Sequence, residues 1–230
     1  MSERDENGFR FERKYHVQDM PFEAIELLVR RNPALFRDAY PKRIVNNIYF
    51  DTPGLRSLLE NMDGIADRTK ARIRWYGPML GEHAKPVLEF KLKRGMVGAK
   101  NSFRLQPLVV AKGMGAADVF RCLEESSLPE SVLGPLRSYE PVLLNRYHRK
   151  YFISADRLYR ITLDWQLEFF RFMKHNNAFA SGRLDRDSTV VELKYSGAID
   201  RIDERVAGYF PFRVTRMSKF VTGLHSIGAV

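Results

Sequence analysis

Along much of this chain, apolar and polar residues alternate one by one, and long cations recur at the polar positions. In residues 70–76, for example, apolar residues alternate with Lys70, Arg72 and Arg74. A period of two is typical of a β-strand, because successive side chains point to opposite faces of a sheet. The pattern predicts strands at 9–17, 44–51, 70–76, 87–93, 159–169 and 189–196, and less regularly at 142–154.

Amphipathic stretches between these strands predict helices. They cover residues 21–31, 55–62, 116–125, 199–207 and 217–227, while breaks that contain Gly predict loops at 77–86 and 182–187. No linker rich in Pro, Gly or Ser divides the chain, which favours one domain at 9–230 after a disordered, polar lead at 1–8. We expect an α+β fold in which a barrel or a strongly curved sheet of antiparallel strands carries flanking helices.

The chain is strongly basic. Its 230 residues include 38 Lys and Arg against 28 Asp and Glu, which gives a formal net charge of +10 and a pI of about 9.8. A basic balance favours an anionic partner, such as nucleic acid, a membrane surface or a phosphorylated small molecule. It is equally compatible with a solvated basic surface, and composition alone does not separate these interpretations.

The single cysteine, Cys122, excludes a disulfide within the chain and is typical of a reducing compartment. No apolar run approaches the ~20 residues of a membrane-spanning helix. Residues 1–8 are too polar for a signal peptide. We therefore expect a cytoplasmic location, with any coupling to a membrane made through a membrane-protein partner chain.

The polar faces of the predicted strands leave two arrangements open. They carry long cations and isolated carboxylates, namely Arg10, Glu12, Lys14, Arg72, Arg74, Glu89, Lys91, Lys93, Arg160, Glu192 and Lys194. If these faces point outward, the sheet is simply solvated. If they point inward, the cations need an anion, because a buried charge without a partner is costly. A phosphate chain would suit them, since Arg can donate two parallel hydrogen bonds to phosphate oxygens and the Glu residues could bind Mg²⁺ or Mn²⁺.

Seven short motifs follow one another along the chain. They are NIYFDTP at 47–53, KARIRWYG at 70–77, LEFK at 88–91, YHR at 147–149, RITLD at 160–164, ELKY at 192–195 and SKF at 218–220. Each motif is weak alone, but their order and spacing resemble the vacuolar transporter chaperone (VTC) domain over residues 9–223. That family belongs to the triphosphate tunnel metalloenzymes. The resemblance implies a closed antiparallel β-barrel of about eight strands around a basic tunnel, and polymerase members make inorganic polyphosphate from ATP.

Carried over position by position, the resemblance implies roles for three groups of residues. The cations that would clamp the transferring phosphates are Arg72, Arg74, Lys91, Arg149 and Arg160. Further ligands of phosphate or nucleotide would be Arg10, Lys14, Lys100, Lys194 and Lys219. The metal, Mn²⁺ or Mg²⁺, would be bound by Glu192, with Glu12 on the first strand beside it. Lys93 and Arg104 are weaker candidates.

The first strand departs from the pattern of the hydrolytic tunnel enzymes. Those enzymes begin with Glu-x-Glu-x-Lys, whose paired carboxylates collect metals that help to activate water, whereas residues 10–14 read RFERK here. The cation at Arg10 favours phosphate binding over metal binding, and so a polyphosphate polymerase that uses ATP. A triphosphate or nucleoside triphosphate hydrolase and a binding module without turnover remain alternatives. The aromatic residues do not interleave with the basic ones in a stacking pattern, which argues against single-stranded nucleic acid, and a nucleic-acid reader is the last alternative.

Overall fold

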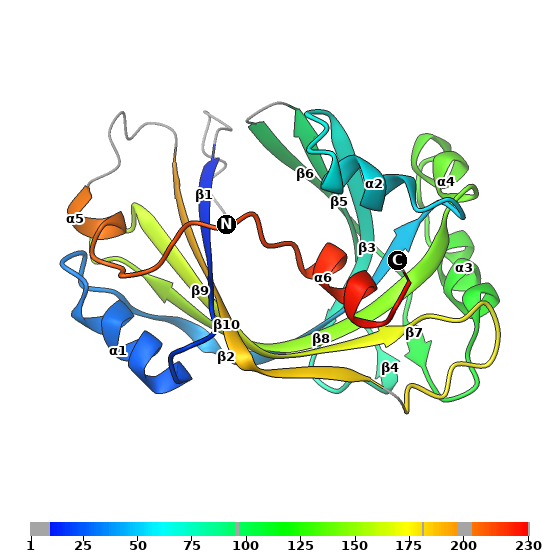
Figure 1. The fold of residues 1–230 in the computed structure, drawn as a ribbon. Coiled ribbons are helices and arrows are strands. Elements are labelled where there is room, and N and C mark those ends of the chain that lie inside the picture. The colour runs from blue at the N-terminus through cyan, green and yellow to red at the C-terminus, as the bar shows by residue number, and fades with distance from the viewer. Residues whose placement is uncertain (1–9, 95–96, 181, 197–203, 230) are drawn as a thin grey trace. The chain divides into compact units, whose positions relative to one another are not determined.

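The computed structural model describes residues 10–94, 97–180, 182–196 and 204–229 (Figure 1). The predicted disordered lead at 1–8 and the first part of the predicted helix at 199–207 lie outside these residues. No helix in the described residues combines the length and the apolar character that a membrane crossing requires.

The strands form one large sheet and one small one. In order across the large sheet, the strands are β1 (Arg10–Val17), β10 (Arg183–Ser196), β9 (Tyr159–Arg171), β8 (Glu140–Ile153), β2 (Arg37–Asp51), β3 (Arg68–Tyr76), β5 (Val87–Arg94) and β6 (Val97–Arg104). The small sheet pairs β4 (Gly81–His83) with β7 (Leu108–Val110). The helices are α1 (Phe22–Arg31), α2 (Arg56–Met62), α3 (Ala116–Glu125), α4 (Glu130–Leu136), α5 (Glu204–Ala207) and α6 (Lys219–Ser226).

The large sheet is not closed into a barrel. Within the described residues β1 and β6 end the strand order, so the two edge strands are not hydrogen-bonded to each other. The predicted closed barrel is therefore wrong, although the α+β class and the antiparallel pairing are as expected. The alternation of residues determines which face of each strand is apolar, but closure also requires the first strand to pair with the last.

Most of the predicted strands and helices are present, with some different boundaries. β2 begins at Arg37 instead of residue 44, and β10 begins at Arg183, where a loop was expected. The predicted loop at 77–86 contains the short strand β4. β6, β7 and α4 were not predicted at all.

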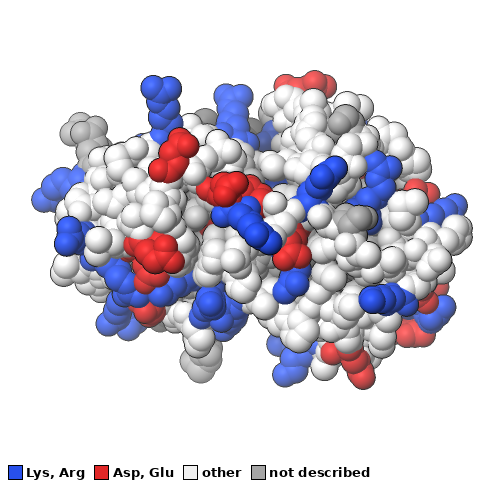
Figure 2. All heavy atoms as spheres, turned by 60° about the horizontal axis from the view of Figure 1, so that its bottom comes forward, with Lys and Arg blue, Asp and Glu red and all other residues white. Residues whose placement is uncertain are grey.

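Charged side chains are dispersed on the face of the molecule that Figure 2 shows. There, Lys and Arg lie among Asp and Glu and among uncharged residues, and the described cations form no continuous patch in that view. Some cations of the described residues are paired locally: Arg30 lies 2.7 Å from Glu26 and 3.0 Å from Asp38. The excess of Lys and Arg over Asp and Glu therefore does not form a single basic surface on this face.

The chain is organised as two compact units. The first unit comprises Met1–Arg43, His148–Leu167 and Asp185–Met217, and the second comprises Ile44–Tyr147, Glu168–Leu184 and Ser218–Val230. β2, β8, β9 and β10 each contribute residues to both units. Each unit has its own hydrophobic core.

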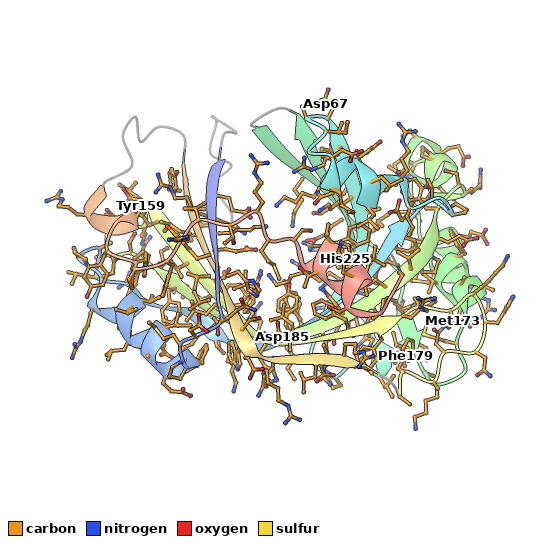
Figure 3. All side chains as sticks on the ribbon, viewed as in Figure 1. Asp67, Tyr159, Met173, Phe179, Asp185 and His225 are labelled. Atoms are coloured by element: carbon orange, nitrogen blue, oxygen red, sulfur yellow. The ribbon has the colours of Figure 1, made fainter. Side chains whose placement is uncertain are left out.

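The core of the first unit lies where α1 packs against the apolar faces of β1, β9 and β10. Tyr15, Tyr159 and Val191, one from each strand, are at most 4% exposed, and Figure 3 shows Tyr159 at the start of β9. Ile25 and Val29 stand four residues apart on α1 and are fully buried in the same cluster. This spacing places both on one side of the helix, which explains why α1 covers this sheet face.

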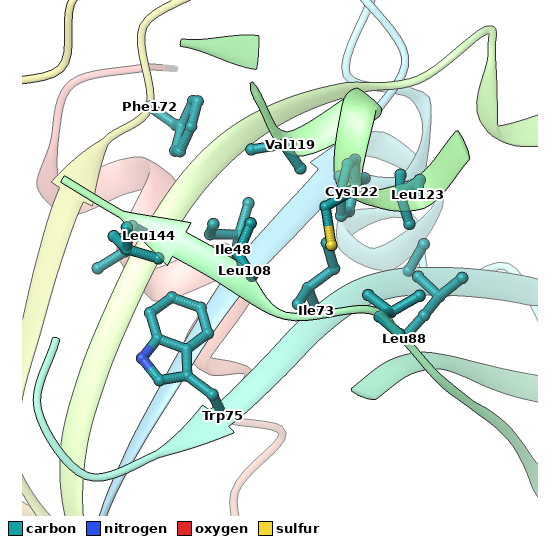
Figure 4. Packing of buried hydrophobic residues seen from close by; sticks show 14 of the residues in the cluster. Ile48, Ile73, Trp75, Leu88, Leu108, Val119, Cys122, Leu123, Leu144 and Phe172 are labelled. Atoms are coloured by element: carbon teal, nitrogen blue, oxygen red, sulfur yellow. The ribbon is translucent and has the colours of Figure 1, made fainter. Parts of the chain in front are cut away.

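The core of the second unit lies where α3 packs against β2, β3 and β5 (Figure 4). Ile48, Ile73 and Trp75 from the sheet meet Val119 and Cys122 from the helix. Burial raises the pKa of the Cys122 thiol to about 11, so this side chain stays protonated and packs as an apolar group.

The polar residues of β3 lie on the face opposite to this core. Because the odd-numbered residues Ala71 to Trp75 pack inward, Lys70, Arg72 and Arg74 project from the other side of the strand. They are partly buried there, not fully solvated. The neighbouring strands continue this polar face, which holds most of the candidate functional residues of the second unit.

Candidate functional site

A single carboxylate, Glu89 of β5, gathers three cations in the second unit. Arg72 donates from Nε and Nη2 to Oε2 of Glu89 at 2.9 and 2.7 Å. Lys100 of β6 donates from Nζ to Oε1 at 2.7 Å, and Nη1 of Arg74 lies 3.6 Å from Oε2. These contacts follow from the register, since Glu89 stands opposite Arg72 on β3 and opposite Ser102 on β6. Three positive charges therefore share one negative charge.

Uncharged side chains hold the two guanidinium groups in place. Arg72 donates from Nη1 to the Tyr49 hydroxyl at 3.1 Å. Arg74 donates from Nε to Oδ1 of Asn47 at 2.9 Å and from Nη2 to the Tyr147 hydroxyl at 3.3 Å. Tyr49 and Asn47 lie directly opposite Arg72 and Arg74 on the neighbouring strand β2. Both arginines are thus positioned by neutral hydrogen-bond partners, which orient their positive charge without cancelling it.

α6 brings a further ammonium group to the same unit. Nζ of Lys219, a residue that is 8% exposed, lies 5.0 Å from the centre of the Tyr147 ring. The preceding residue, Ser218, accepts a hydrogen bond from Nζ of Lys70 at 2.9 Å. Phe220 packs on Tyr49 with ring centroids 5.3 Å apart. The helix therefore presents its first residues to the polar side chains of β2, β3 and β8.

The pKa values of Glu89 and Tyr49 are shifted by the electrostatic potential within this cluster. Burial alone would raise the pKa of Glu89, but the charges of Arg72, Arg74 and Lys100 lower it to about 2. Burial would likewise raise the pKa of the Tyr49 phenol, but the charges of the two arginines and of Lys219 lower it. A buried phenol with a lowered pKa indicates that the local potential is positive even though Glu89 is ionised.

A second cluster lies on the polar face of the first unit, where β1 pairs with β10. Lys14 stands opposite Glu192, and Glu12 stands opposite Lys194. Nζ of Lys14 lies 2.9 Å from Glu12 and 3.6 Å from Oε1 of Glu192, while Nζ of Lys194 lies 3.2 Å from Oε2 of Glu192. Carboxylates and ammonium groups therefore alternate across this strand pair, in contrast to the cation-rich cluster of the second unit.

Arg149 of β8 extends this cluster across β9. Its Nε and Nη2 lie 2.5 and 2.6 Å from the two carboxylate oxygens of Asp164, which is fully buried. Nη2 also lies 3.8 Å from Oε2 of Glu192. The bidentate contact with Asp164 fixes the plane of the guanidinium group.

The structure brings most of the predicted site residues into these two clusters. The second unit gathers Arg72, Arg74, Lys100 and Lys219, and the first gathers Glu12, Lys14, Arg149, Glu192 and Lys194. Lys91 is exposed on β5, opposite Lys70 and Lys100. Arg160 is exposed near the start of β9, at an even-numbered position like Asp164, and Arg104 is exposed at the end of β6. The side chains of Arg10 and Lys93 lie outside the described residues.

Sequence reasoning missed the roles of several residues that build these clusters. It assigned no role to Asp164, Tyr49, Asn47 and Tyr147, and it considered Glu89 only as one of several possible metal ligands on the polar faces. All five fall within the family motifs, and Tyr49, Asn47 and Glu89 stand on strands next to β3. Strand register was the signal that could have found them, because a partner opposite an arginine lies within reach of its guanidinium group.

The chemistry of the Glu12 and Glu192 side chains decides whether they suit a metal ion. They offer hard carboxylate oxygens, and Mg²⁺ in proteins is commonly held by one or two carboxylates together with substrate phosphates. The described residues contain no group of three or more His, Cys, Asp and Glu side chains that could hold a metal by itself. Lys14 lies against both carboxylates. The pair therefore fits a divalent metal that arrives with phosphate, whose oxygens supply further ligands and a new partner for the ammonium group.

Comparison with protein families gives one match, the VTC domain, over residues 9–227. Comparison with curated proteins gives no match.

Several solved structures resemble the fold of this chain at low sequence identity. A proposed adenylate cyclase from Vibrio parahaemolyticus superposes with a TM-score of 0.55 at 16% identity, covering 94% of this chain and 99% of the other. A protein from Pyrococcus horikoshii gives a TM-score of 0.51 at 15% identity, with 94% and 99% covered. A proposed adenylyl cyclase from Hippeastrum, described as having a dominant triphosphatase activity, gives 0.51 at 14% identity, with 94% and 96% covered. At these identities the likeness shows the fold alone.

Proposed function

We propose, since this chain belongs to the VTC domain family, that it transfers the terminal phosphoryl group of ATP to a growing chain of inorganic polyphosphate. The reaction would require Mn²⁺ or Mg²⁺. No nucleic acid would be involved, and a membrane-protein partner chain would be needed if synthesis were coupled to export.

The observation that carries this proposal is the set of three cations that share one carboxylate on the polar face of the second unit. Arg72, Arg74 and Lys100 share Glu89. The lowered pKa of the buried Tyr49 phenol indicates that the positive charge outweighs the negative. A polyphosphate chain carries about one negative charge per phosphate, and arginines that neutral groups already orient can bind it bidentately. We assign phosphate binding to this cluster.

The first unit suits the metal-bound nucleotide. Glu12 and Glu192 would hold the divalent cation, which would neutralise charge on the phosphate oxygens of ATP. With Glu12 and Glu192 holding the metal, Lys14 and Lys194, which lie close to these carboxylates, would contact the phosphates, as would Arg149. Because Arg149 contacts two oxygens of Asp164, its guanidinium group would do so in a fixed orientation.

The transfer needs no covalent group from the protein. A terminal oxygen of the polyphosphate attacks the γ-phosphorus of ATP, the bond from that phosphorus to the β–γ bridging oxygen breaks, and ADP leaves. The protein residues position the two phosphate chains and stabilise the charge that spreads over the γ-phosphoryl oxygens.

The proposal is tested by incubating the protein with ATP and either Mn²⁺ or Mg²⁺, and following both ADP release and long-chain polyphosphate on a gel. We expect chains from the wild-type protein and a loss of at least a hundredfold in Arg72→Ala and in Glu192→Gln. Arg56→Ala is a matched control, because Arg56 is an exposed arginine on α2 that pairs with Glu60. It should leave the rate unchanged.

A hydrolase is the second candidate, because a divalent metal held by Glu12 and Glu192 could activate water for attack on a triphosphate. Release of free phosphate without chains would select this alternative. Tight binding of polyphosphate without consumption of ATP would instead identify a binding module. Full activity of Glu192→Gln would contradict the metal assignment, and displacement of polyphosphate by duplex DNA would contradict the choice of ligand.

A further inference from the structure

We infer that Tyr40, Tyr151 and Arg43 of the first unit form a stacking site for the base of the donor nucleotide. The inference rests on the proposed function and deepens it, because it assigns the part of ATP that the phosphate clusters do not recognise. It is carried by the geometry of the exposed Tyr40 ring, which packs against Tyr151, the ring that lies beside Arg149.

Tyr40 is an exposed ring held at a defined angle. Tyr40 is 56% exposed. Its ring meets the ring of Tyr151 edge-on, with a distance of 5.6 Å between the ring centroids and an angle of 84° between the ring planes. The guanidinium carbon of Arg43 lies 5.2 Å from the centre of the Tyr40 ring and 5.8 Å from that of Tyr151. Two aromatic rings and one planar cation therefore meet at a position that remains open to solvent.

The same rings adjoin the phosphate cluster of the first unit. Tyr151 follows Arg149 by two residues on β8, so both side chains lie on one face of the strand. The guanidinium carbon of Arg149 lies 5.8 Å from the centre of the Tyr151 ring. Arg149 in turn lies 3.8 Å from Glu192, the carboxylate assigned to the metal. The side chain of Arg149 therefore lies between Tyr151 and Glu192, where the nucleotide phosphates are proposed to bind.

There is free space beside the exposed ring. Tyr40 lines an open hollow of about 460 Å³ whose other lining residues are Asp38, Ala39, Pro41, Lys42 and Lys150. All six belong to the first unit. A hollow of this size has room for a flat heterocycle beside the ring.

Burial explains little of the role of Tyr40. A ring that is 56% exposed buries too little surface to contribute much to stability, and Tyr40 follows the start of β2 by three residues, in a segment that is exposed almost throughout. A nucleobase, by contrast, presents a π-face that stacks on tyrosine and on arginine. Because every base has such a face, the site would favour nucleotides over inorganic polyphosphate without strongly preferring one base.

The test compares ATP, GTP and inorganic tripolyphosphate as ligands of the full-length protein, measured by titration calorimetry with the same divalent metal. In Tyr40→Ala we expect the dissociation constants of ATP and GTP to rise about tenfold, while that of tripolyphosphate changes less than twofold. Tyr40→Phe keeps the ring and should bind all three ligands like the wild type. Tyr76→Ala is the matched control, because Tyr76 is an exposed tyrosine at the end of β3 in the second unit.

Two results would overturn the inference. If Tyr40→Ala weakens ATP and tripolyphosphate equally, the ring serves the phosphates or the fold instead of the base. If Tyr40→Ala binds ATP like the wild type, the base does not stack there. Both results leave the proposed function intact, provided that the wild-type protein binds tripolyphosphate and Arg72→Ala does not. If the wild-type protein binds neither ligand, the inference and the proposed function both fall.

Discussion

At the scale of single residues, the ion pair between Arg149 and Asp164 is the most deeply buried charge contact in the described part of the first unit. Asp164 is fully buried, and Arg149 is 8% exposed. Removal of one partner from such a pair leaves a buried charge uncompensated. We expect Asp164→Asn to lower the free energy of unfolding by about 3 kcal/mol, as measured by urea denaturation at neutral pH.

Asp67→Asn provides the control for this prediction, because Asp67 is exposed. It should change the unfolding free energy by less than about 0.5 kcal/mol. Equal effects of the two substitutions would show that the buried pair does not contribute as described.

Glu89 gives the fold a specific dependence on pH. Its pKa of about 2 lies below the ordinary value of 4.5, because three cations outweigh the effect of burial. The lowered pKa means that the ionised carboxylate stabilises the fold fully above about pH 4.5 and loses this contribution as the pH falls toward 2. Glu89→Gln should therefore cost about 2 kcal/mol of stability at pH 7. The difference from the wild type should shrink between pH 4.5 and 2.

This prediction is checked by denaturation of both proteins at several pH values. The exposed Glu82 supplies a control substitution, Glu82→Gln, which should show no such trend. A difference between the wild type and Glu89→Gln that stays constant from pH 7 to pH 2 would show that Glu89 titrates normally.

Tyr49 can report whether phosphate binds to the second unit. Its phenol has a lowered pKa because Arg72, Arg74 and Lys219 outweigh the effect of burial. A bound polyanion would cancel part of this positive potential, so tripolyphosphate should raise the pKa of Tyr49. The measurement is an NMR titration of tyrosine ring carbons, with Tyr49→Phe to assign the signal. A Tyr49 signal that titrates identically with and without tripolyphosphate would place the anion elsewhere.

The sequence predicted the positions of the cations in the two clusters better than it predicted their hydrogen-bond and ion-pair partners. Arg72 and Arg74 were predictable, because a period of two places them on the polar face of β3. Glu89 and Asp164 acquired their roles from strand register and from the reach of long side chains, neither of which a single strand reveals. The neutral partner Asn47 is still less conspicuous, because an amide carries no charge pattern to follow.

At the scale of elements, the packing of α6 depends on a glycine. A Cβ placed on Gly223 would lie 2.6 Å from Cδ1 of Phe169 and 2.7 Å from Cδ2 of Leu143, both of them buried. Alanine favours a helix over glycine by about 1 kcal/mol, but overpacking a core costs about 1–3 kcal/mol. We expect the second effect to prevail, so that Gly223→Ala lowers the melting temperature and weakens tripolyphosphate binding through displacement of Lys219.

Gly134 in α4 offers a matched substitution. A Cβ there meets only Oε1 of Glu130, at 3.4 Å, so Gly134→Ala should change stability by about 1 kcal/mol or less. Calorimetric melting of the two variants compares the same chemical change in two helices. A Gly223→Ala protein as stable as Gly134→Ala would mean that α6 can move away from the sheet without cost.

The elements that sequence reasoning missed are those with little apolar periodicity. β6 reads VGAKNSFR and is defined by its backbone pairing with β5. β4 and β7 have three residues each, too few to show a period. The first half of β2 is almost entirely exposed and contains Pro41, so nothing in its composition resembles a half-buried strand.

At the scale of the whole molecule, the net charge of +10 should govern the strength of polyanion binding. Each contact between a cation and a phosphate is weakened as salt screens it. The logarithm of the tripolyphosphate affinity should therefore fall linearly with the logarithm of NaCl concentration. Arg72→Ala should bind more weakly and with a slope that is shallower by about one unit.

Calorimetric titrations from 0.05 to 0.5 M NaCl would measure this dependence. Arg56→Ala, which removes an exposed charge outside both clusters, should keep the wild-type slope. A slope near zero for the wild-type protein would contradict an electrostatic site of the kind proposed.

The fold class was predictable from the sequence, but whether the large sheet closes into a barrel was not. The family motifs and the alternating strands led to an antiparallel α+β fold with phosphate-binding cations, and the family match covers residues 9–227. Whether the edge strands pair depends on contacts between segments far apart in the chain. The alternation of residues within each strand carries no information about such contacts, and this is why the closed barrel was predicted wrongly.

The division of the chain into two units has a practical consequence for spectroscopy. The protein contains two tryptophans, and each unit holds one of them: Trp165 in the first and Trp75 in the second. Trp75 is 2% exposed and donates to the carbonyl oxygen of Pro78, whereas Trp165 stacks against Phe22. Trp75→Phe and Trp165→Phe would each leave a single tryptophan, which can be excited selectively in the presence of the 10 tyrosines. The emission of each protein would then follow one unit alone, and the order in which the units melt could be read from intrinsic fluorescence without any added label.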